Sequence, residues 1–169
     1  QAARWNRNGP PVRVAVNLSP VQLGTPGLAQ RVIDVLRECG LASELLELEV
    51  TEGALLENTE ATRAAMESLR RHGICMALDD FGTGFSSLAS LTRMPIGAIK
   101  VARCFVNGLL DGGESDAIVR AVLAMARSLK LRVTAEGVET REQARALQAM
   151  ACDTLQGFYF SPPVPADDV

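Results

Sequence analysis

The residues with the clearest chemical potential are polar side chains that follow short apolar runs of this 169-residue chain. They come at or directly after the end of each run: Asn17, Glu52, the pair Asp79-Asp80, Lys100, Glu136 and Gln156. Four of them carry carboxylates, which repel one another and become protonated when they are gathered without a neutralising cation. If the fold brings these positions together, a divalent metal ion is therefore the simplest partner for the set.

The types of these residues favour a hard metal ion. Asn17, Glu52 and Asp79 offer oxygen ligands without histidine or thiolate, which suits Mg²⁺ or Mn²⁺ better than Zn²⁺. The adjacent Asp80 could serve a second ion, because one carboxylate can span metals held ~4 Å apart. Such a pair of ions clamps the attacking and leaving oxygens of a phosphoryl displacement. Lys100 would then be a fixed cation that orients a nucleophilic water or neutralises developing charge.

The segment Asp79–Ser87 reads Asp-Asp-Phe-Gly-Thr-Gly-Phe-Ser-Ser and has two glycines that permit positive φ. It does not match a dinucleotide fingerprint, because it lacks the third glycine and begins with two acidic residues that would repel a pyrophosphate. Beside a metal site, it is a candidate for a mobile lid that responds to ligand or metal occupancy. Glu139, close to Glu136 in sequence, either anchors this lid or is a solvated carboxylate at a helix start.

Near-continuously apolar or β-branched runs alternate with longer helical patterns, which is typical of parallel strands that are covered on both faces. The predicted strands are Val12–Leu18, Leu46–Thr51, Ile74–Leu78, Ala98–Ala102, Arg132–Ala135 and Thr154–Phe158. Capping residues and closing glycines predict the helices between them. The first helix begins at Thr25, with Pro26 at the first helical position, and ends at Gly40; the second runs from Asn58 or Thr59 to Gly73; and a short third covers Ser86–Arg93. The fourth begins at Glu114 or Ser115 and has Ile118, Val122, Met125 and Leu129 on one face. The fifth begins with a capping box at Thr140–Gln143.

A TIM-type (β/α) barrel best accounts for this α/β pattern, because the carboxyl ends of its parallel strands meet at one mouth. A doubly wound open sheet would bring only some of the polar residues to a crevice. A full barrel has eight strands and ~250 residues, whereas six strands are recognised here, so we expect the barrel to be incomplete at the N-terminus. Its two open sheet edges would need a partner, a further segment or a rearrangement.

Composition limits the classes of function. Hydrophobic residues make up 47% of the chain, enough for one core, whereas 4% aromatics give few platforms for stacking nucleic-acid bases. The 17 basic and 20 acidic residues argue against a broad basic surface for DNA, RNA or an anionic membrane. No apolar run reaches the ~20 residues of a membrane span. Four cysteines without metal-site spacing predict buried free thiols in a reducing, cytoplasmic compartment, and the lone His72 fits a helix end better than a catalytic site.

Several blocks of the sequence resemble, in order, the conserved blocks of the EAL domain family. They are Asn17-Leu-Ser, Leu48-Glu-Val-Thr-Glu52, the Asp-Asp-Phe-Gly-Thr-Gly block within Leu78–Leu88, Ile99-Lys100, Ala135-Glu-Gly-Val-Glu-Thr140 and Leu155-Gln-Gly-Phe158. The resemblance covers nearly the whole chain, and the third and fifth blocks are very specific in combination. It implies an EAL domain over residues 1–169 that lacks the N-terminal part carrying the Glu-Ala-Leu motif.

The resemblance implies a bacterial signalling domain that hydrolyses cyclic di-GMP to linear pGpG with Mg²⁺ or Mn²⁺ by a two-metal mechanism. It also implies roles for single residues. Asn17, Glu52 and Asp79 resemble metal ligands, and Asp80 resembles a ligand of the second metal. Lys100 resembles the residue that holds the hydrolytic water, Glu136 and Gln156 resemble metal-site or phosphate-site residues, and Glu139 resembles the anchor of the Asp79–Ser87 loop. Family members can form homodimers, and an upstream sensor or GGDEF (diguanylate-cyclase) domain often accompanies them.

Two departures from the family pattern bear on activity. The Glu-Ala-Leu motif, whose glutamate is a metal ligand in the family, is absent, as is the arginine expected shortly after it. The family's Lys-Ile-Asp reads Lys100-Val-Ala102 here, and positions two apart on a strand face the same side, so a carboxylate is missing beside Lys100. A site short of one ligand and one supporting carboxylate binds metal poorly. We therefore expect at most weak metal-dependent hydrolysis from these residues alone.

Two functions of different classes follow. In the first, the domain is a phosphodiesterase whose missing glutamate is supplied upstream, and Ala102 lowers activity without abolishing it. In the second, it is a catalytically inactive EAL domain that acts as a cyclic di-GMP receptor or a protein-interaction module. Chemistry alone also permits an enolase-like site with Lys100 as base and carboxylates on Mg²⁺, which fits the ordered blocks much less well.

Overall fold

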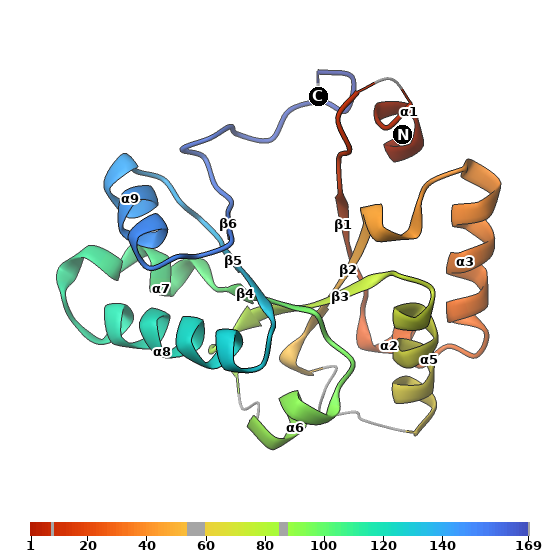
Figure 1. Ribbon diagram of the computed structural model, residues 1–169, viewed down its shortest axis with the longest axis horizontal. Helices are drawn as coiled ribbons and strands as arrows, with labels where there is room; N and C mark the ends of the chain where they lie inside the picture. Colours follow the sequence, from red (N-terminus) through yellow and green to blue (C-terminus); the bar gives the residue numbers. More distant parts are fainter. Residues whose placement is uncertain (8, 54–59, 85–87, 169) are drawn as a thin grey trace. The chain divides into compact units, whose positions relative to one another are not determined.

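The computed structural model describes residues 1–7, 9–53, 60–84 and 88–168 (Figure 1). Among the described residues the chain forms two compact units: the first takes in those of 1–77 and 88–96, and the second those of 78–84 and Gly97–Asp168. Strand β3 (Cys75–Phe81) begins in the first unit and ends in the second. The helix start predicted at Asn58 or Thr59 lies outside the described residues, as do Phe85–Ser87 of the predicted lid.

A six-stranded sheet has the order β1-β2-β3-β4-β5-β6, so the strands pair in chain order, and the β1–β2, β4–β5 and β5–β6 pairs are parallel. The bounds are β1 Val14–Asn17, β2 Leu46–Thr51, β3 Cys75–Phe81, β4 Ala98–Val101, β5 Arg132–Ala135 and β6 Thr154–Leu155. Each predicted strand has a counterpart, and β2 and β5 have their predicted bounds. The predicted bounds of β1 and β4 are too long by one to three residues, and the predicted end of β6 at Phe158 is wrong, because the strand ends at Leu155. The predicted end of β3 at Leu78 is wrong, because the strand continues through Asp79 and Asp80 to Phe81.

Strands β1 and β2 of the first unit present different chemistry on their two faces. One face and helix α3 (Leu28–Cys39) enclose an apolar groove of about 370 Å³. Its lining includes alternate strand residues and α3 residues: Val14, Val16, Leu46, Leu48, Val32 and Leu36. The register places Asn17 beside Glu49. Because side chains alternate along a strand, Asn17 and Glu49 point to the face opposite the groove.

The helices of the first unit are short apart from α3 and α5, which pack against each other (Figure 1). The elements are α1 Ala2–Trp5, α2 Pro20–Leu23, α3 Leu28–Cys39, η1 Ser43–Leu45, α5 Glu60–Arg71 and α6 Leu88–Arg93. The predicted start of α3 at Pro26 is wrong, because Gly27 has φ +79° and ends the preceding turn in a left-handed conformation. Gly40 has φ +70° and closes α3 as predicted.

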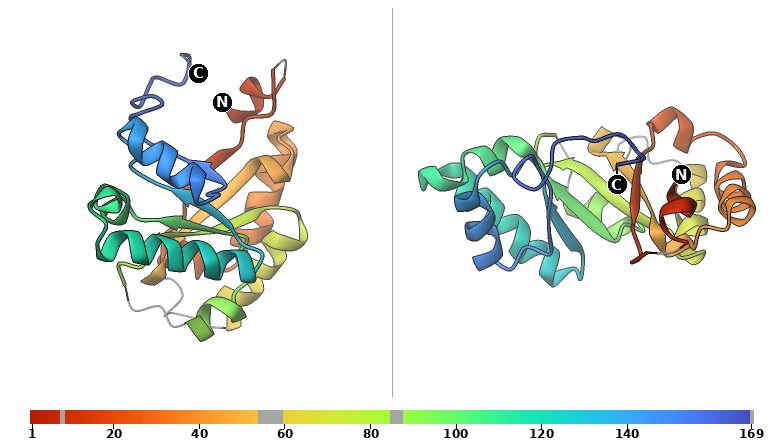
Figure 2. Two further views of the ribbon diagram at one scale, coloured as in Figure 1. Left: turned by 60° about the vertical axis from the view of Figure 1, so that its left-hand side comes forward. Right: turned by 90° about the horizontal axis from the view of Figure 1, so that it is seen from above.

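In the second unit, α7 (Arg103–Asn107) packs on α8 (Glu114–Ser128), and α8 lies beside β4 and β5 (Figure 1, Figure 2). The unit also contains η2 Leu109–Asp111 and α9 Arg141–Ala149. The predicted capping box is confirmed, because Thr140 Oγ1 accepts a hydrogen bond from Gln143 N and Gln143 Oε1 accepts one from Thr140 N. The apolar face predicted for α8 is only partly right: Val119, Val122, Leu123 and Ala126 are its buried residues.

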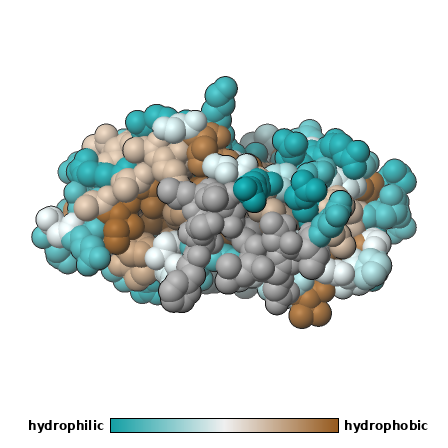
Figure 3. Space-filling model, turned by 90° about the horizontal axis from the view of Figure 1, so that it is seen from below, coloured by the Kyte–Doolittle hydropathy of each residue, from teal (hydrophilic) through white to brown (hydrophobic). Residues whose placement is uncertain are grey.

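The surface carries residues of both hydropathy classes. On the face drawn in Figure 3, hydrophilic and hydrophobic residues are intermixed over the described part of the chain. The four cysteines are free, as predicted, but the prediction that they are buried is wrong: Cys39 and Cys104 are exposed, and Cys75 and Cys152 are partly covered. His72 is exposed at the end of α5. None of the helices in the described part of the chain is long and apolar enough to cross a membrane.

Gly157 gives a test of the packing around β6. A Cβ atom added at Gly157 would lie 2.1 Å from the carbonyl oxygen of Val138, a backbone atom that cannot rotate away. We therefore expect Gly157→Ala to lower the free energy of unfolding by about 3 kcal/mol, measured by urea denaturation. The control is Gly112→Ala, because Gly112 has φ +65° but open space around it, so the backbone strain should cost about 1 kcal/mol. Equal losses in the two variants would contradict this packing.

Candidate functional site

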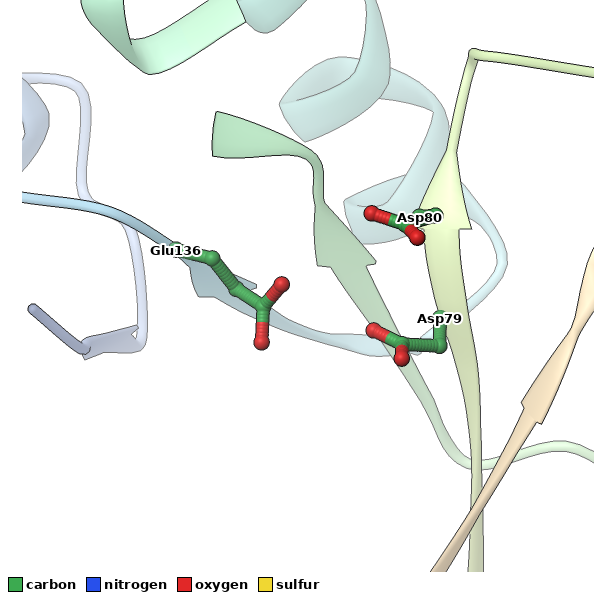
Figure 4. Close-up of side chains that lie close together, drawn as sticks. All are labelled: Asp79, Asp80 and Glu136. Carbon is green, nitrogen blue, oxygen red and sulfur yellow. The ribbon is translucent and has the colours of Figure 1, made fainter. Parts of the chain in front are cut away.

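Three carboxylates of the second unit lie together (Figure 4). Asp79 and Asp80 are near the end of β3, and Glu136 directly follows β5. One carboxylate oxygen of each residue lies within 4.8 Å of those of the other two. Figure 4 shows the two aspartate side chains directed toward Glu136. A single hard cation can contact oxygens arranged in this way.

The backbone at Asp80 explains how two consecutive carboxylates reach one place. Successive side chains of a regular strand point to opposite faces. Asp80 instead has φ +52°, in the left-handed region that residues other than glycine seldom adopt. Its carbonyl accepts hydrogen bonds from Thr83 N at 3.3 Å and Thr83 Oγ1 at 2.8 Å, which stabilise the turn. A strained residue within a cluster of carboxylates indicates a functional constraint.

Lys100 of β4 is buried against two of these carboxylates. Its Nζ lies 2.5 Å from Glu136 Oε1 and 3.5 Å from Asp79 Oδ1. At the longer distance Lys100 attracts Asp79 electrostatically but does not donate a hydrogen bond to it. Asp79 Oδ1 is accordingly a buried acceptor without a hydrogen-bond donor among the described residues. Such an atom is costly to leave unsatisfied, and coordination of a cation would satisfy it.

The charge of the cluster fits a divalent cation. One lysine beside three carboxylates gives a formal charge of −2, and two of these carboxylates, Asp79 and Glu136, are largely covered. The donor set consists of carboxylate oxygens, which suit Mg²⁺, Mn²⁺ or Ca²⁺ rather than a thiophilic metal. Asp79, Asp80 and Glu136 are therefore the residues that would hold the metal in this unit.

Asn17 and Glu52, the other predicted ligands, belong to the first unit. Asn17 ends β1 and is exposed, whereas Glu52 directly follows β2 and is buried. Sequence reasoning missed Glu49, which is buried and lies beside Asn17 in register on the polar face of β2. The missed signal is the alternation of glutamate and leucine in Leu-Glu-Leu-Glu-Val, which places Glu47 and Glu49 on one face. Metal binding by Asn17 and Glu52 stays a prediction.

Glu139 lies outside the carboxylate cluster, and its carboxylate forms an ion pair with the guanidinium of Arg103 in α7. Gln156 follows β6 with an exposed side chain, and its backbone is firmly bonded. Gln156 N donates to Ala135 O at 2.9 Å, and Gln156 O accepts from Val138 N at 2.9 Å. These bonds fix the loop between β5 and α9. The predicted roles of the Glu139 and Gln156 side chains stay predictions.

A model of the EAL domain matches residues 1–163. The chain belongs to the EAL domain family. Its relatives include the "Cyclic di-GMP phosphodiesterase NbdA" of Pseudomonas aeruginosa, 45% identical over 91% of this chain and 20% of that protein. The "Bifunctional diguanylate cyclase/cyclic di-GMP phosphodiesterase MucR" of the same organism is 39% identical over 99% of this chain and 23% of that protein. This EAL chain thus spans about one fifth of the length of these curated relatives.

Solved structures agree with this membership. The "PaMucR Phosphodiesterase, c-di-GMP complex" superposes with a TM-score of 0.91 at 38% identity, over 98% of this chain and 68% of that one. The "Klebsiella pneumoniae BlrP1 pH 9.0 manganese/cy-diGMP complex" gives 0.82 at 36% identity, over 89% and 39% of the two chains. Together with the parallel strands in chain order, these matches confirm the predicted TIM-type (β/α) barrel class of the EAL fold.

By its resemblance to the EAL pattern, Ala102 is expected to stand where that pattern has aspartate, and this correspondence stays a prediction. Ala102 follows β4, is 2% exposed and is the N-cap residue of α7 without a side-chain hydrogen bond. The methyl side chain of Ala102 carries no negative charge near Lys100 in the sequence. It also cannot accept a hydrogen bond from the first N–H groups of α7. Ala102 therefore provides neither a charge nor a side-chain cap at this position.

Proposed function

We propose that this EAL domain hydrolyses cyclic di-GMP to linear pGpG with Mg²⁺ or Mn²⁺ by a two-metal mechanism. The observation that carries the proposal is the cluster of Asp79, Asp80 and Glu136 with the buried Lys100 against it. The substrate follows from the relatives, since NbdA is named a cyclic di-GMP phosphodiesterase and the PaMucR structure is a complex with c-di-GMP. The manganese complex of BlrP1 supports a divalent metal.

The reaction needs one bond exchange at phosphorus. The oxygen of a water molecule forms a bond to one phosphorus, the P–O3′ bond breaks, and the 3′ oxygen takes up a proton, which leaves the 5′-phosphate of pGpG. Bound divalent ions supply Lewis-acid stabilisation of the attacking and leaving oxygens. Asp79, Asp80 and Glu136 would hold these ions, and Lys100 would orient the water and offset the negative charge that develops on the phosphate oxygens.

Four further residues complete the proposed site by their resemblance to the EAL pattern. Asn17 and Glu52 contribute metal ligands, Gln156 contributes to the metal or phosphate site, and Glu139 anchors the Asp79–Ser87 loop. Asn17 has Glu49 as its neighbour in register on one face of β1 and β2. The oxygen donors of Asn17 and Glu52 match the hard cation proposed for the cluster.

A second candidate function rests on Ala102. Without the aspartate of the EAL pattern at this buried position, the domain would bind cyclic di-GMP or a protein partner without turnover. This receptor function and hydrolysis use the same ligand, so a binding assay and a product assay together separate them.

The cellular setting is part of the same proposal. We place the domain in the cytoplasm of a bacterium, acting on cyclic di-GMP and not on DNA or RNA. An upstream sensor or GGDEF domain is supported by the name of MucR, which combines a diguanylate cyclase with a phosphodiesterase. Homodimer formation is proposed from the family resemblance alone.

The test is to incubate the purified protein with cyclic di-GMP and Mn²⁺ or Mg²⁺, and to quantify pGpG by chromatography and ligand binding by calorimetry. We expect slow hydrolysis that a chelator abolishes, and a higher kcat in the matched variant Ala102→Asp. Binding without any pGpG would assign the receptor function instead. Absence of both binding and product would contradict the proposal, and fast turnover would show that Ala102 is compensated.

A further inference from the structure

The short helix α7 contacts both loops that carry the carboxylates of the second unit. The Phe105 ring lies against Gly82, two residues after Asp80, where an added Cβ would come within 2.8 Å of Phe105 Cε2. The Arg103 side chain lies against Gly137, the residue after Glu136. Gly82 and Gly137 both have positive φ, at +97° and +68°. The α7 side chains therefore pack directly on bare backbone next to the metal-site residues.

The contact between Arg103 and Gly137 is very close. A Cβ atom added at Gly137 would lie 2.2 Å from Arg103 Cγ, 2.7 Å from its Cβ and 2.8 Å from its Cδ. The aliphatic stem of Arg103 thus occupies the space that a side chain at position 137 would need. Beyond the stem, the guanidinium reaches the carboxylate of Glu139. The Arg103 side chain consequently contacts the loop at two residues, Gly137 and Glu139.

Other bonds already fix the neighbouring loop residues. Glu136 N donates to Val101 O at 3.1 Å, Val138 N donates to Gln156 O at 2.9 Å, and Glu139 N donates to Gln143 Oε1 at 2.8 Å. Gly137 is the residue of this segment with the greatest intrinsic backbone freedom. A rotation there would swing the Glu136 side chain relative to Asp79 and Asp80. The Arg103 stem restricts this rotation because it fills the space that the backbone would have to enter. The exposed ion pair between Arg103 and Glu139 alone would restrict the rotation only weakly.

We propose that Arg103 is a positioning residue that keeps the Glu136 carboxylate at the metal site by packing on Gly137 and pairing with Glu139. The proposal rests on the metal site of the proposed function, and it gives Arg103 a positioning role, since the carboxylate cluster itself consists of Asp79, Asp80 and Glu136. Sequence reasoning did not single out Arg103. Its contact becomes visible only when β4 and β5 place the two segments side by side.

The test compares Arg103→Ala with the conservative Arg103→Lys, which keeps an aliphatic stem and a positive charge. We expect Arg103→Ala to weaken Mn²⁺ binding about fivefold by calorimetry and to speed hydrogen exchange at the amides of residues 136–139 in metal-free protein. Arg103→Lys should stay within twofold of the wild type in both measurements. The matched control is Arg120→Ala, because Arg120 is 60% exposed and paired with Asp116, as Arg103 is 62% exposed and paired with Glu139.

The outcomes separate this inference from the metal site on which it rests. If Asp79→Asn loses Mn²⁺ affinity while Arg103→Ala behaves like Arg120→Ala, Arg103 has no positioning role and the metal site stands. Weaker Mn²⁺ binding in Arg103→Ala with unchanged exchange at residues 136–139 would also overturn the inference. If Asp79→Asn binds Mn²⁺ as the wild type does, the metal site is wrong. The exchange measurement in metal-free protein would then still show whether Arg103 holds the backbone of residues 136–139, but no longer at a metal site.

Discussion

Replacing Lys100 by methionine is expected to destabilise the metal-free protein by about 3 kcal/mol or more and to increase its stabilisation by Mn²⁺. Lys100 is buried, and the side chains of Asp79 and Glu136 are only 17% and 19% exposed, so the variant leaves both carboxylates without this cation in a poorly solvated place. A divalent ion can replace the missing charge. Thermal unfolding with and without Mn²⁺ should therefore show a lower Tm and a larger metal-induced rise than in the wild type.

The control for this prediction is Lys130→Met, since Lys130 is exposed and is the other lysine of the chain. Its backbone has φ +58°, which lysine and methionine tolerate equally, so the control isolates the removal of a lysine charge. We expect its Tm and its response to Mn²⁺ to match the wild type. The account fails if Lys100→Met is as stable as this control and gains no more from Mn²⁺.

Replacing Asp79 by asparagine is expected to weaken Mn²⁺ binding at least tenfold, or about 1.4 kcal/mol. The two side chains have nearly the same shape, so the change removes a charge and leaves the packing intact. The effect follows from Asp79 Oδ1, the buried acceptor without a hydrogen-bond donor among the residues that the structure describes. Isothermal titration calorimetry measures the affinity.

The matched control is Asp116→Asn, which removes a carboxylate of the same kind from the surface of α8, where Asp116 pairs with Arg120. Its affinity for Mn²⁺ should equal that of the wild type, because Asp116 lies outside the carboxylate cluster. Unchanged affinity in Asp79→Asn as well would remove Asp79 from the metal ligands. It would then favour a structural role for the Lys100 ion pairs.

Local sequence signals predicted much of the fold. Strands β2 and β5 have their predicted bounds, and the capping box at Thr140 forms as expected. These features depend on contiguous apolar runs or on bonds within one helical turn. The predicted start of α3 is too early, because Pro26 is typical of a first helical position. Gly27 has a left-handed φ, so the helix begins only at Leu28.

The face of α8 could not be predicted from periodicity alone. Apolar residues occur nearly all around this helix, so the pattern permits more than one buried stripe. The choice of Val119 and Leu123 over Ile118 and Met125 depends on how α8 packs beside α7 and the strands. That packing is a tertiary property.

The candidate site was predicted in composition but not in geometry. The sequence predicts that Asp79, Asp80 and Glu136 lie near Lys100, because the three acidic residues directly follow predicted strands and Lys100 lies within another one. The structure brings the four together. The left-handed φ of Asp80 has no signature in an Asp-Asp-Phe sequence. The packing of Arg103 on Gly137 likewise joins residues from different β/α units, which no spacing rule reveals.

The most direct test of the central claim is a crystal of the protein grown with Mn²⁺ and measured for anomalous scattering. The account predicts a manganese peak within bonding distance of carboxylate oxygens of Asp79, Asp80 and Glu136. A peak bound by other residues, or none at these three while the crystallised protein still hydrolyses cyclic di-GMP, would contradict it.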